Sequence, residues 1–93
     1  MDVTVQDNPA RHRFELLLDG EIAGFADYRE HDGAVMVVHG EVDRAHRGRG
    51  LGSVLARQTL DALRERGVKV VPACPFFARY VEEHPEYADL VAR

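Results

Sequence analysis

This chain has one cysteine, no tryptophan and no apolar run long enough to cross a bilayer. A lone cysteine excludes an internal disulfide framework, and the opening Met1-Asp2-Val3-Thr4 does not resemble a secretion signal. The five histidines show no metal-ligand spacing, and a net charge of -4 lacks the positive excess of a general nucleic-acid binder. We therefore expect a cytoplasmic protein without a metal, a membrane contact or a nucleic-acid partner.

The remaining composition is typical of one small globular domain spanning residues 1–93. Apolar residues make up 45% of the chain and charged residues 30%. Positive charge is concentrated in one place, where Arg44, Arg47 and Arg49 accompany His46. An acidic body with one basic notch fits a small polyanionic ligand better than a long polyanion.

The first half of the chain predicts an antiparallel meander of four strands. Alternating or β-branched apolar residues mark strands at residues 3–7, 14–18, 22–29 and 34–42. Asp19-Gly20 suits a tight hairpin turn, and His31-Asp32-Gly33 provides the next one. Gly24 interrupts the third strand, as a residue at a bulge often does.

From Gly50 onward the apolar period becomes helical. Residues 51–66 predict a helix that ends at Gly67, and residues 68–71 predict a buried fifth strand. The apolar side of the helix consists of Leu51, Val54, Leu55, Ala62 and Leu63. A second helix begins near Pro75, and a short last helix covers residues 86–91. The order ββββ-α-β-α is that of an α+β fold.

The turn Arg47-Gly48-Arg49-Gly50-Leu51-Gly52 joins the fourth strand to the first helix. Backbone N–H groups at a helix N-terminus suit an anion, and arginine adds charge-assisted bonds to phosphate oxygens. The sequence lacks the Gly-Lys-Ser/Thr of a P-loop, and an antiparallel meander is the wrong context for a dinucleotide fingerprint. Two alternatives remain at this level: a flexible connection with solvated arginines, and an RNA- or partner-binding arginine notch.

The pattern Arg47-x-x-Gly50-x-Gly52 resembles the coenzyme-A-binding motif of the GCN5-related N-acetyltransferases (GNAT superfamily). Three further segments resemble a short, single-domain branch of that superfamily: His39-Gly40-Glu41-Val42, Pro72-Ala73-Cys74-Pro75-Phe76 and His84-Pro85-Glu86-Tyr87. Gly40 is a departure, because relatives often carry threonine there.

The resemblance implies an acetyl-CoA site. The strand that ends at Val42 would hydrogen-bond the pantetheine arm, where strands four and five splay apart. The N–H groups of the turn would hold the pyrophosphate. The cofactor-binding residues implied are Val42, Arg47, Gly48, Arg49, Gly50, Leu51, Gly52 and Ser53. The aromatic residues Phe76, Phe77 and Tyr80 are expected mainly in the core, with one ring available to the adenine or pantetheine.

His39 and Glu41 are candidate bases. Alternation along the fourth strand predicts one face shared by Val35, Val37, His39 and Glu41. An ammonium has no lone pair with which to attack a thioester, so either residue could remove the proton, directly or through water. The competing interpretation is a solvated sheet face, with Glu41 paired to a nearby arginine.

Cys74 is the third catalytic candidate. Free cysteine is often only a small buried hydrophobe, but Pro75 places this one near a helix N-cap, where the dipole favours the thiolate. The resemblance also implies that this cysteine lies near the coenzyme thiol. Two routes follow: direct attack by the amine with Cys74 protonating the departing thiolate, or transfer through an acetylated Cys74.

The leading hypothesis is an acetyl-CoA-dependent N-acetyltransferase acting on a primary amine such as an exposed lysine, a peptide terminus or a small polyamine. The alternatives are a CoA- or acyl-CoA-binding module without significant turnover and, less favoured, an RNA- or partner-binding module. Only a short connection, residues 7–12, joins the first two strands, so the acceptor groove should be open. We expect a monomer or a weak homodimer formed through the edge strand near Val3.

Overall fold

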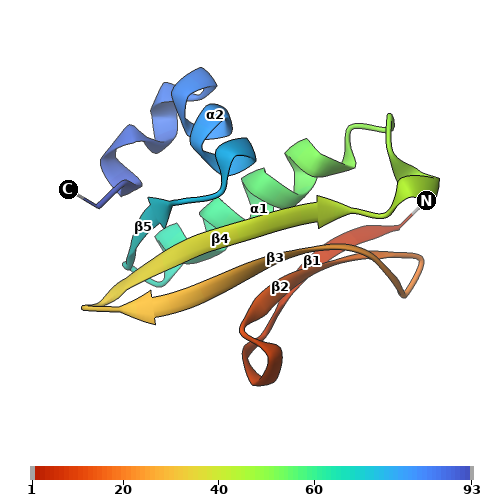
Figure 1. Ribbon diagram of the computed structural model, residues 1–93, viewed down its shortest axis with the longest axis horizontal. Helices are drawn as coiled ribbons and strands as arrows, with labels where there is room; N and C mark the ends of the chain where they lie inside the picture. Colours follow the sequence, from red (N-terminus) through yellow and green to blue (C-terminus); the bar gives the residue numbers. More distant parts are fainter. Residues whose placement is uncertain (1, 93) are drawn as a thin grey trace.

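The computed structural model describes residues 2–92, and it confirms the α+β class (Figure 1). One five-stranded sheet has the order β1-β2-β3-β4-β5, antiparallel from β1 to β4 and parallel between β4 and β5. The strands are β1 (Val3–Asn8), β2 (Arg13–Leu18), β3 (Glu21–His31), β4 (Ala34–Val42) and β5 (Lys69–Pro72). The helices are α1 (Leu51–Glu65) and α2 (Pro75–Glu83), with 3-10 turns η1 (Pro9–Arg11), η2 (Arg44–His46) and η3 (Pro85–Leu90).

Two tight turns set the register of the meander. Asp19 and Gly20 have φ values of 50° and 86°, and Asp32 and Gly33 have 52° and 77°. Positive φ at both central residues is the requirement of a type I′ hairpin turn, which Asp-Gly meets at low cost. Both predicted hairpins are therefore confirmed. The last element is a 3-10 turn where a short helix was expected.

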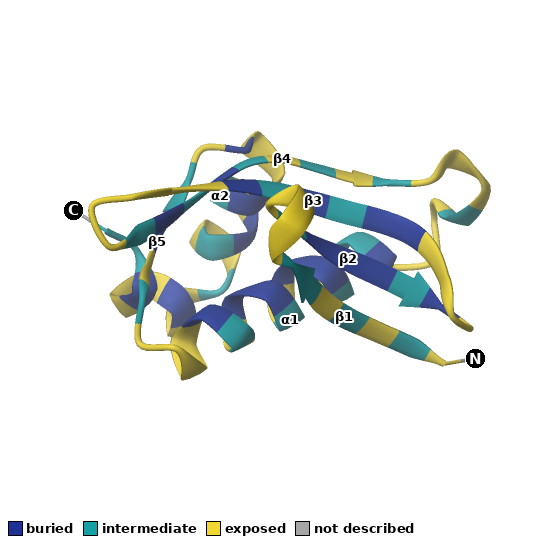
Figure 2. Cartoon of the chain, turned by 90° about the horizontal axis from the view of Figure 1, so that it is seen from below, coloured by how far each residue is buried: buried dark blue, intermediate teal, exposed yellow. Residues whose placement is uncertain are grey.

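Helix α1 packs along one face of the sheet and carries much of the core (Figure 2). The predicted apolar side is confirmed at Leu51, Leu55 and Leu63, whereas Val54 and Ala62 are only partly buried. Thr59 is fully buried although it is polar, because it lies between the turns that carry Leu55 and Leu63. The other face of the sheet carries no α-helix from the described residues 2–92 (Figure 2).

A bulge in β4 overturns the prediction of one face shared by four residues. Tyr28 pairs with Val37 and Asp27 with His39, so Val38 has no partner on β3. Since an extra residue shifts the alternation by one, Val37 faces the core and His39 faces away from it. Val35 lies with Val37, and His39 and Glu41 share the opposite face.

Strands β4 and β5 separate after a short parallel pairing. Their register runs from Ala34 opposite Lys69 to Val37 opposite Pro72, and β4 continues alone on that side to Val42. On the other edge of β5, Val70 forms a parallel bridge with Val91. No helix among residues 2–92 is long and apolar enough to cross a membrane.

Candidate functional site

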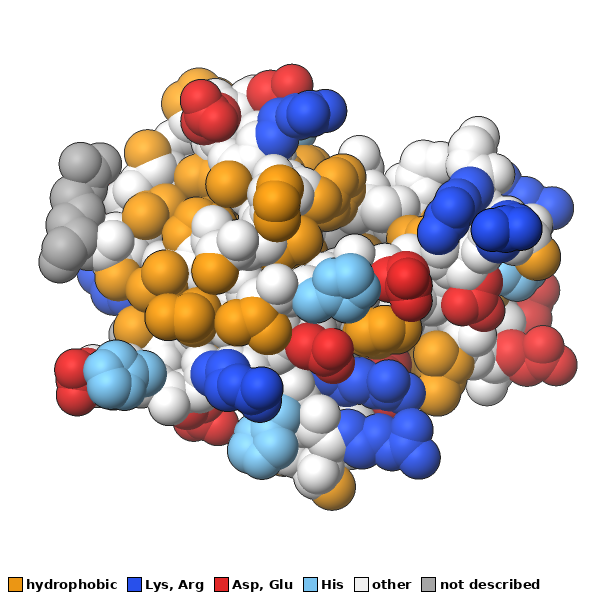
Figure 3. Space-filling model, in the orientation of Figure 1, with side chains coloured by type: hydrophobic (Ala, Val, Ile, Leu, Met, Phe, Trp, Pro, Cys, Tyr) orange, Lys and Arg blue, Asp and Glu red, His pale blue; other side chains and the backbone are white. Residues whose placement is uncertain are grey.

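The turn between β4 and α1 has the backbone conformation that its glycines allow. Gly48 has a φ of 84° and Gly50, at the N-cap of α1, a φ of 75°. No side chain caps the helix, so its first N–H groups stay available at the positive end of the dipole. Figure 3 shows basic side chains gathered over this connection, and they are arginines because the only lysine of the chain, Lys69, lies on β5. The arrangement suits an anion.

Arg47 ties the turn to the end of β4. Its Nε donates a 3.2 Å hydrogen bond to the carbonyl oxygen of Val42, while the side chain stays exposed. This bond holds the guanidinium of Arg47 beside the end of β4, where the strand has no partner on its β5 side. Gly48, Arg49 and Ser53 lie around the same turn and helix start, whereas Leu51 is buried and contributes its side chain to the core.

A pocket of about 290 Å³ opens where β4 has left β5. It is bounded by the end of β4, the start of α1 and the start of α2. Its lining residues are Gly40, Glu41, Val42, Arg47, Gly52, Leu55 and Phe76. Four of the residues predicted for the site, Glu41, Val42, Arg47 and Gly52, therefore come together here. Gly40, Leu55 and Phe76 were not among them.

His39 and Glu41 lie next to this pocket on the open face of the sheet. Their side chains are 57% and 47% exposed, and His39 Nε2 lies 4.0 Å from Glu41 Oε1. The ring of Phe25 lies 6.0 Å from that of His39 and carries the guanidinium of Arg13 on its face. Arg13 also donates to Glu15, so it is engaged away from Glu41. The histidine and glutamate are thus accessible to a molecule arriving from solvent.

Cys74 occupies the N-cap of α2, as predicted, but its side chain is buried. Its backbone N–H donates to the carbonyl of Val37 across the point where the strands separate. A Cβ placed on Gly40 would lie 3.8 Å from the sulfur and 3.3 Å from the ring of Phe77. Gly40 therefore lets α2 approach β4 closely. Gly40 lines the pocket, whereas Cys74 lies behind Gly40 and does not line it.

The aromatic residues of α2 separate into two kinds. Phe77 and Tyr80 are buried, as predicted for core residues, whereas Phe76 is 41% exposed. Phe76 is thus the one ring of the three that stays outside the core, because successive helical residues point about 100° apart. The sequence signal was available: helical spacing puts Phe77 and Tyr80 on one side and Phe76 off it.

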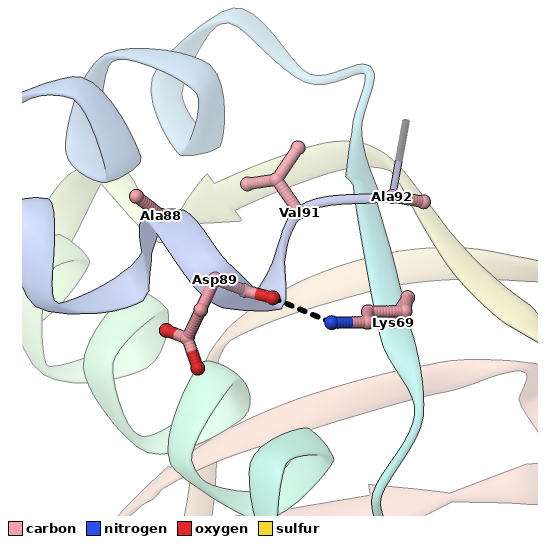
Figure 4. A pocket seen from close by; sticks show the side chains of 5 residues that line it. All are labelled: Lys69, Ala88, Asp89, Val91 and Ala92. Carbon is pink, nitrogen blue, oxygen red and sulfur yellow. Dashed lines mark hydrogen bonds between the residues drawn. The ribbon is translucent and has the colours of Figure 1, made fainter.

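A second surface hollow lies at the far end of β5 (Figure 4). It is lined by Lys69, Ala88, Asp89, Val91 and Ala92. Lys69 Nζ donates to the backbone oxygen of Asp89 at 2.6 Å, and the Asp89 carboxylate pairs with Arg64. The charged groups are thus engaged within the chain. No cluster of metal-ligating side chains is found among residues 2–92.

A comparison against protein-family models gives a match over most of the chain. Residues 13–90 match the model described as GCN5-related N-acetyl-transferase. The chain belongs to this family. Mouse Protein NATD1 is 30% identical over 94 residues, which cover 89% of this chain and 77% of the mouse protein. Human Protein NATD1 is 40% identical over 47 residues, covering 50% of this chain and 42% of the human protein.

Solved structures share the fold. A GCN5-like protein from Staphylococcus aureus superposes with a TM-score of 0.71 at 20% identity, covering 96% of this chain and 87% of that one. A ribosomal-protein-alanine N-acetyltransferase from Brucella melitensis gives a TM-score of 0.59 at 25% identity, covering 87% and 61%. The chain thus spans less than two thirds of the Brucella enzyme.

Proposed function

We propose that this protein binds acetyl-CoA in the pocket between β4, α1 and α2 and transfers the acetyl group to a primary amine. One observation carries the proposal: the end of β4, which has no partner on its β5 side, and the uncapped start of α1 border the same pocket. Unpaired strand groups suit the amides of a pantetheine arm, and a helix N-terminus suits its pyrophosphate. Arg47 adds positive charge between the two.

The residues beside the pocket fit the proton transfers of direct attack. The thioester supplies an activated acetyl group. Glu41, or His39 beside it, accepts the proton that frees the amine lone pair, and both side chains face solvent for this purpose. The amine nitrogen then bonds the acetyl carbon, the carbon–sulfur bond breaks with its electron pair on sulfur, and the nitrogen loses a second proton as the amide forms. The CoA thiolate takes up one proton and leaves as the thiol. Buried Cys74 is the candidate donor of that proton, and its own thiolate is reprotonated by the proton that the nitrogen releases.

The open sheet face favours an accessible amine as acceptor. Only the short turn η1 lies between β1 and β2, and Glu41 and Asp27 add negative charge beside His39. An exposed lysine, a peptide terminus or a small polyamine carries the complementary charge. The alternatives are a CoA-binding module without turnover and an RNA-binding use of the arginine notch.

A melting experiment with and without acetyl-CoA tests the binding half of the proposal. A ligand that binds only the folded state at about 100 times its Kd adds roughly 2.7 kcal/mol, which for a chain of this size raises Tm by about 10 °C or more. Differential scanning fluorimetry measures the shift. An unchanged Tm with acetyl-CoA, together with salt-dependent binding of an RNA oligonucleotide, would favour the RNA-binding alternative. Thiol release on a panel of amines then separates an enzyme from a binding module.

A further inference from the structure

Phe76 is an apolar ring in an unusual position. Only Ile22 and Phe76 are strongly exposed among the large hydrophobic side chains of residues 2–92. Ile22 lies beside a hairpin turn, whereas Phe76 lines the pocket at the start of α2. Exposure of an apolar ring costs free energy in water, and a ring that faces a pocket regains that energy when a ligand covers it.

The ring is held in place by two contacts. A Cβ built on Gly52 would lie 3.2 Å from Phe76 Cζ, so the ring rests directly on the backbone of the first turn of α1. On its other side Phe77 meets it edge to face, with ring centroids 6.0 Å apart. Phe76 therefore forms one apolar wall of the pocket, which Gly40 and Val42 also line.

The pocket combines charged and apolar groups. Arg47 and the N–H groups of the α1 start serve an anion, while Phe76 and Leu55 offer only apolar surface. We infer that Phe76 is the residue that selects for the pantetheine arm of CoA, by covering its aliphatic carbons, while the turn holds the phosphates. This inference rests on the proposed CoA site and assigns the part of the ligand that Phe76 recognises.

Calorimetric titration with two probes tests the assignment. The probes are CoA and adenosine 3′-phosphate 5′-diphosphate, which is CoA without its pantetheine arm. Phe76→Ala should weaken CoA about tenfold, from the apolar area that is no longer covered, and leave the nucleotide probe within about twofold. Phe76→Leu, which keeps apolar bulk, should lose less. Ile22→Ala removes the other exposed apolar side chain and should change neither affinity.

The outcomes separate the two ideas. If wild-type protein binds neither probe, the proposed CoA site is wrong. If wild type binds CoA but Phe76→Ala leaves its affinity unchanged, or weakens both probes equally, the assignment of Phe76 is overturned. Circular dichroism melts establish that each variant is folded. Should Phe76→Ala not fold, Phe76→Leu and Phe76→Met test the same assignment. Each should bind CoA more weakly than wild type and the nucleotide probe equally well. Unchanged CoA affinity in both variants contradicts the assignment.

Discussion

At the scale of single residues, the candidate catalytic side chains differ in their exposure to solvent. His39 and Glu41 are about half exposed and lie 4.0 Å apart at their closest charged atoms, whereas Cys74 is 4% exposed. A base must meet an amine that arrives from solvent, so exposure suits it. A covalent nucleophile must be reached by the acetyl group, and here the Cys74 side chain is buried close to Gly40. Direct attack is therefore the route we propose first.

Variants of Glu41 and Cys74 distinguish the two routes. With direct attack, Glu41→Gln should lower kcat about 100-fold and leave KM for acetyl-CoA unchanged, because the base is lost but the pocket is kept. Cys74→Ala should cost about tenfold or less. Steady-state kinetics with an amine found by screening measures both, and His39→Gln tests the alternative base in the same assay. Abolished activity in Cys74→Ala, with a trapped acetyl-protein in wild type by mass spectrometry, would establish transfer through the cysteine instead.

At the scale of elements, the pairing of β3 with β4 determines which face of the sheet the site side chains occupy. The bulge at Val38 turns His39 and Glu41 to the open face and leaves Gly40 facing Phe77 and the core side. Close approach of the strands depends on Gly24, where an added Cβ would lie 2.7 Å from the carbonyl oxygen of Glu41. Backbone contacts this short cannot be relieved by a side-chain rotation. The bulge expected at Gly24 is found one residue away, since the β2–β3 pairing leaves Ala23 without a partner, and the contact with Glu41 is a second reason for glycine at this position.

Gly24→Ala should therefore destabilise the protein by about 2 kcal/mol and weaken the pocket, because Glu41 and Val42 must shift. Urea unfolding gives the free energy, and acetyl-CoA titration gives the affinity. Gly40→Ala gives a comparison for stability alone: its new Cβ meets a ring carbon of Phe77 at 3.3 Å and no backbone atom that close, so its cost should be smaller than that of Gly24→Ala. Equal stability of Gly24→Ala and wild type would show that the strand contact is not needed.

At the scale of the whole molecule, a polar cluster joins the first strand to the end of α1. Tyr28 Oη donates to Asp7 at 2.6 Å, and Arg66 pairs with the same carboxylate at 2.8 Å. Burial, reinforced by the Asp7 carboxylate, raises the pKa of Tyr28 above its usual range. Burial and the bond to Asp61 raise the pKa of Tyr87 in the same way. Both phenols link segments distant in the sequence.

These raised pKa values predict an alkaline loss of stability. The folded state holds each phenolic proton more tightly than the unfolded chain does, so this stabilisation is complete below pH about 10 and falls as the pH rises further. Tyr28→Phe should lose about 1–3 kcal/mol at pH 8, where the bond to the carboxylate is lost. It should also show a shallower decline above pH about 10. Urea unfolding above that pH measures the slope, and the buried phenols Tyr80 and Tyr87, whose pKa values are also raised, contribute to the part that persists. An unchanged slope would contradict the assignment to Tyr28.

Much of the fold follows from local chemistry in the sequence. Asp-Gly pairs determined the two hairpin turns, β-branched runs determined the strands, and the spacing of leucines determined α1. The turn from Arg47 to Gly52 could be assigned as an anion site because it depends on neighbours in the chain. These features need only local backbone preferences and period, so a single sequence is enough to predict them.

The tertiary structure decided which of these residues meet. The bulge at Val38 has no local signature, because it follows from how β4 pairs with β3, and it separates His39 from Val37. The burial of Cys74 and the position of Phe76 against α1 depend on how closely α2 approaches β4 and α1 at Gly40 and Gly52. The sequence alone determined the elements and the anion-binding turn. Packing between distant segments decided the pocket, since close approach is a property of pairs of surfaces and not of either segment alone.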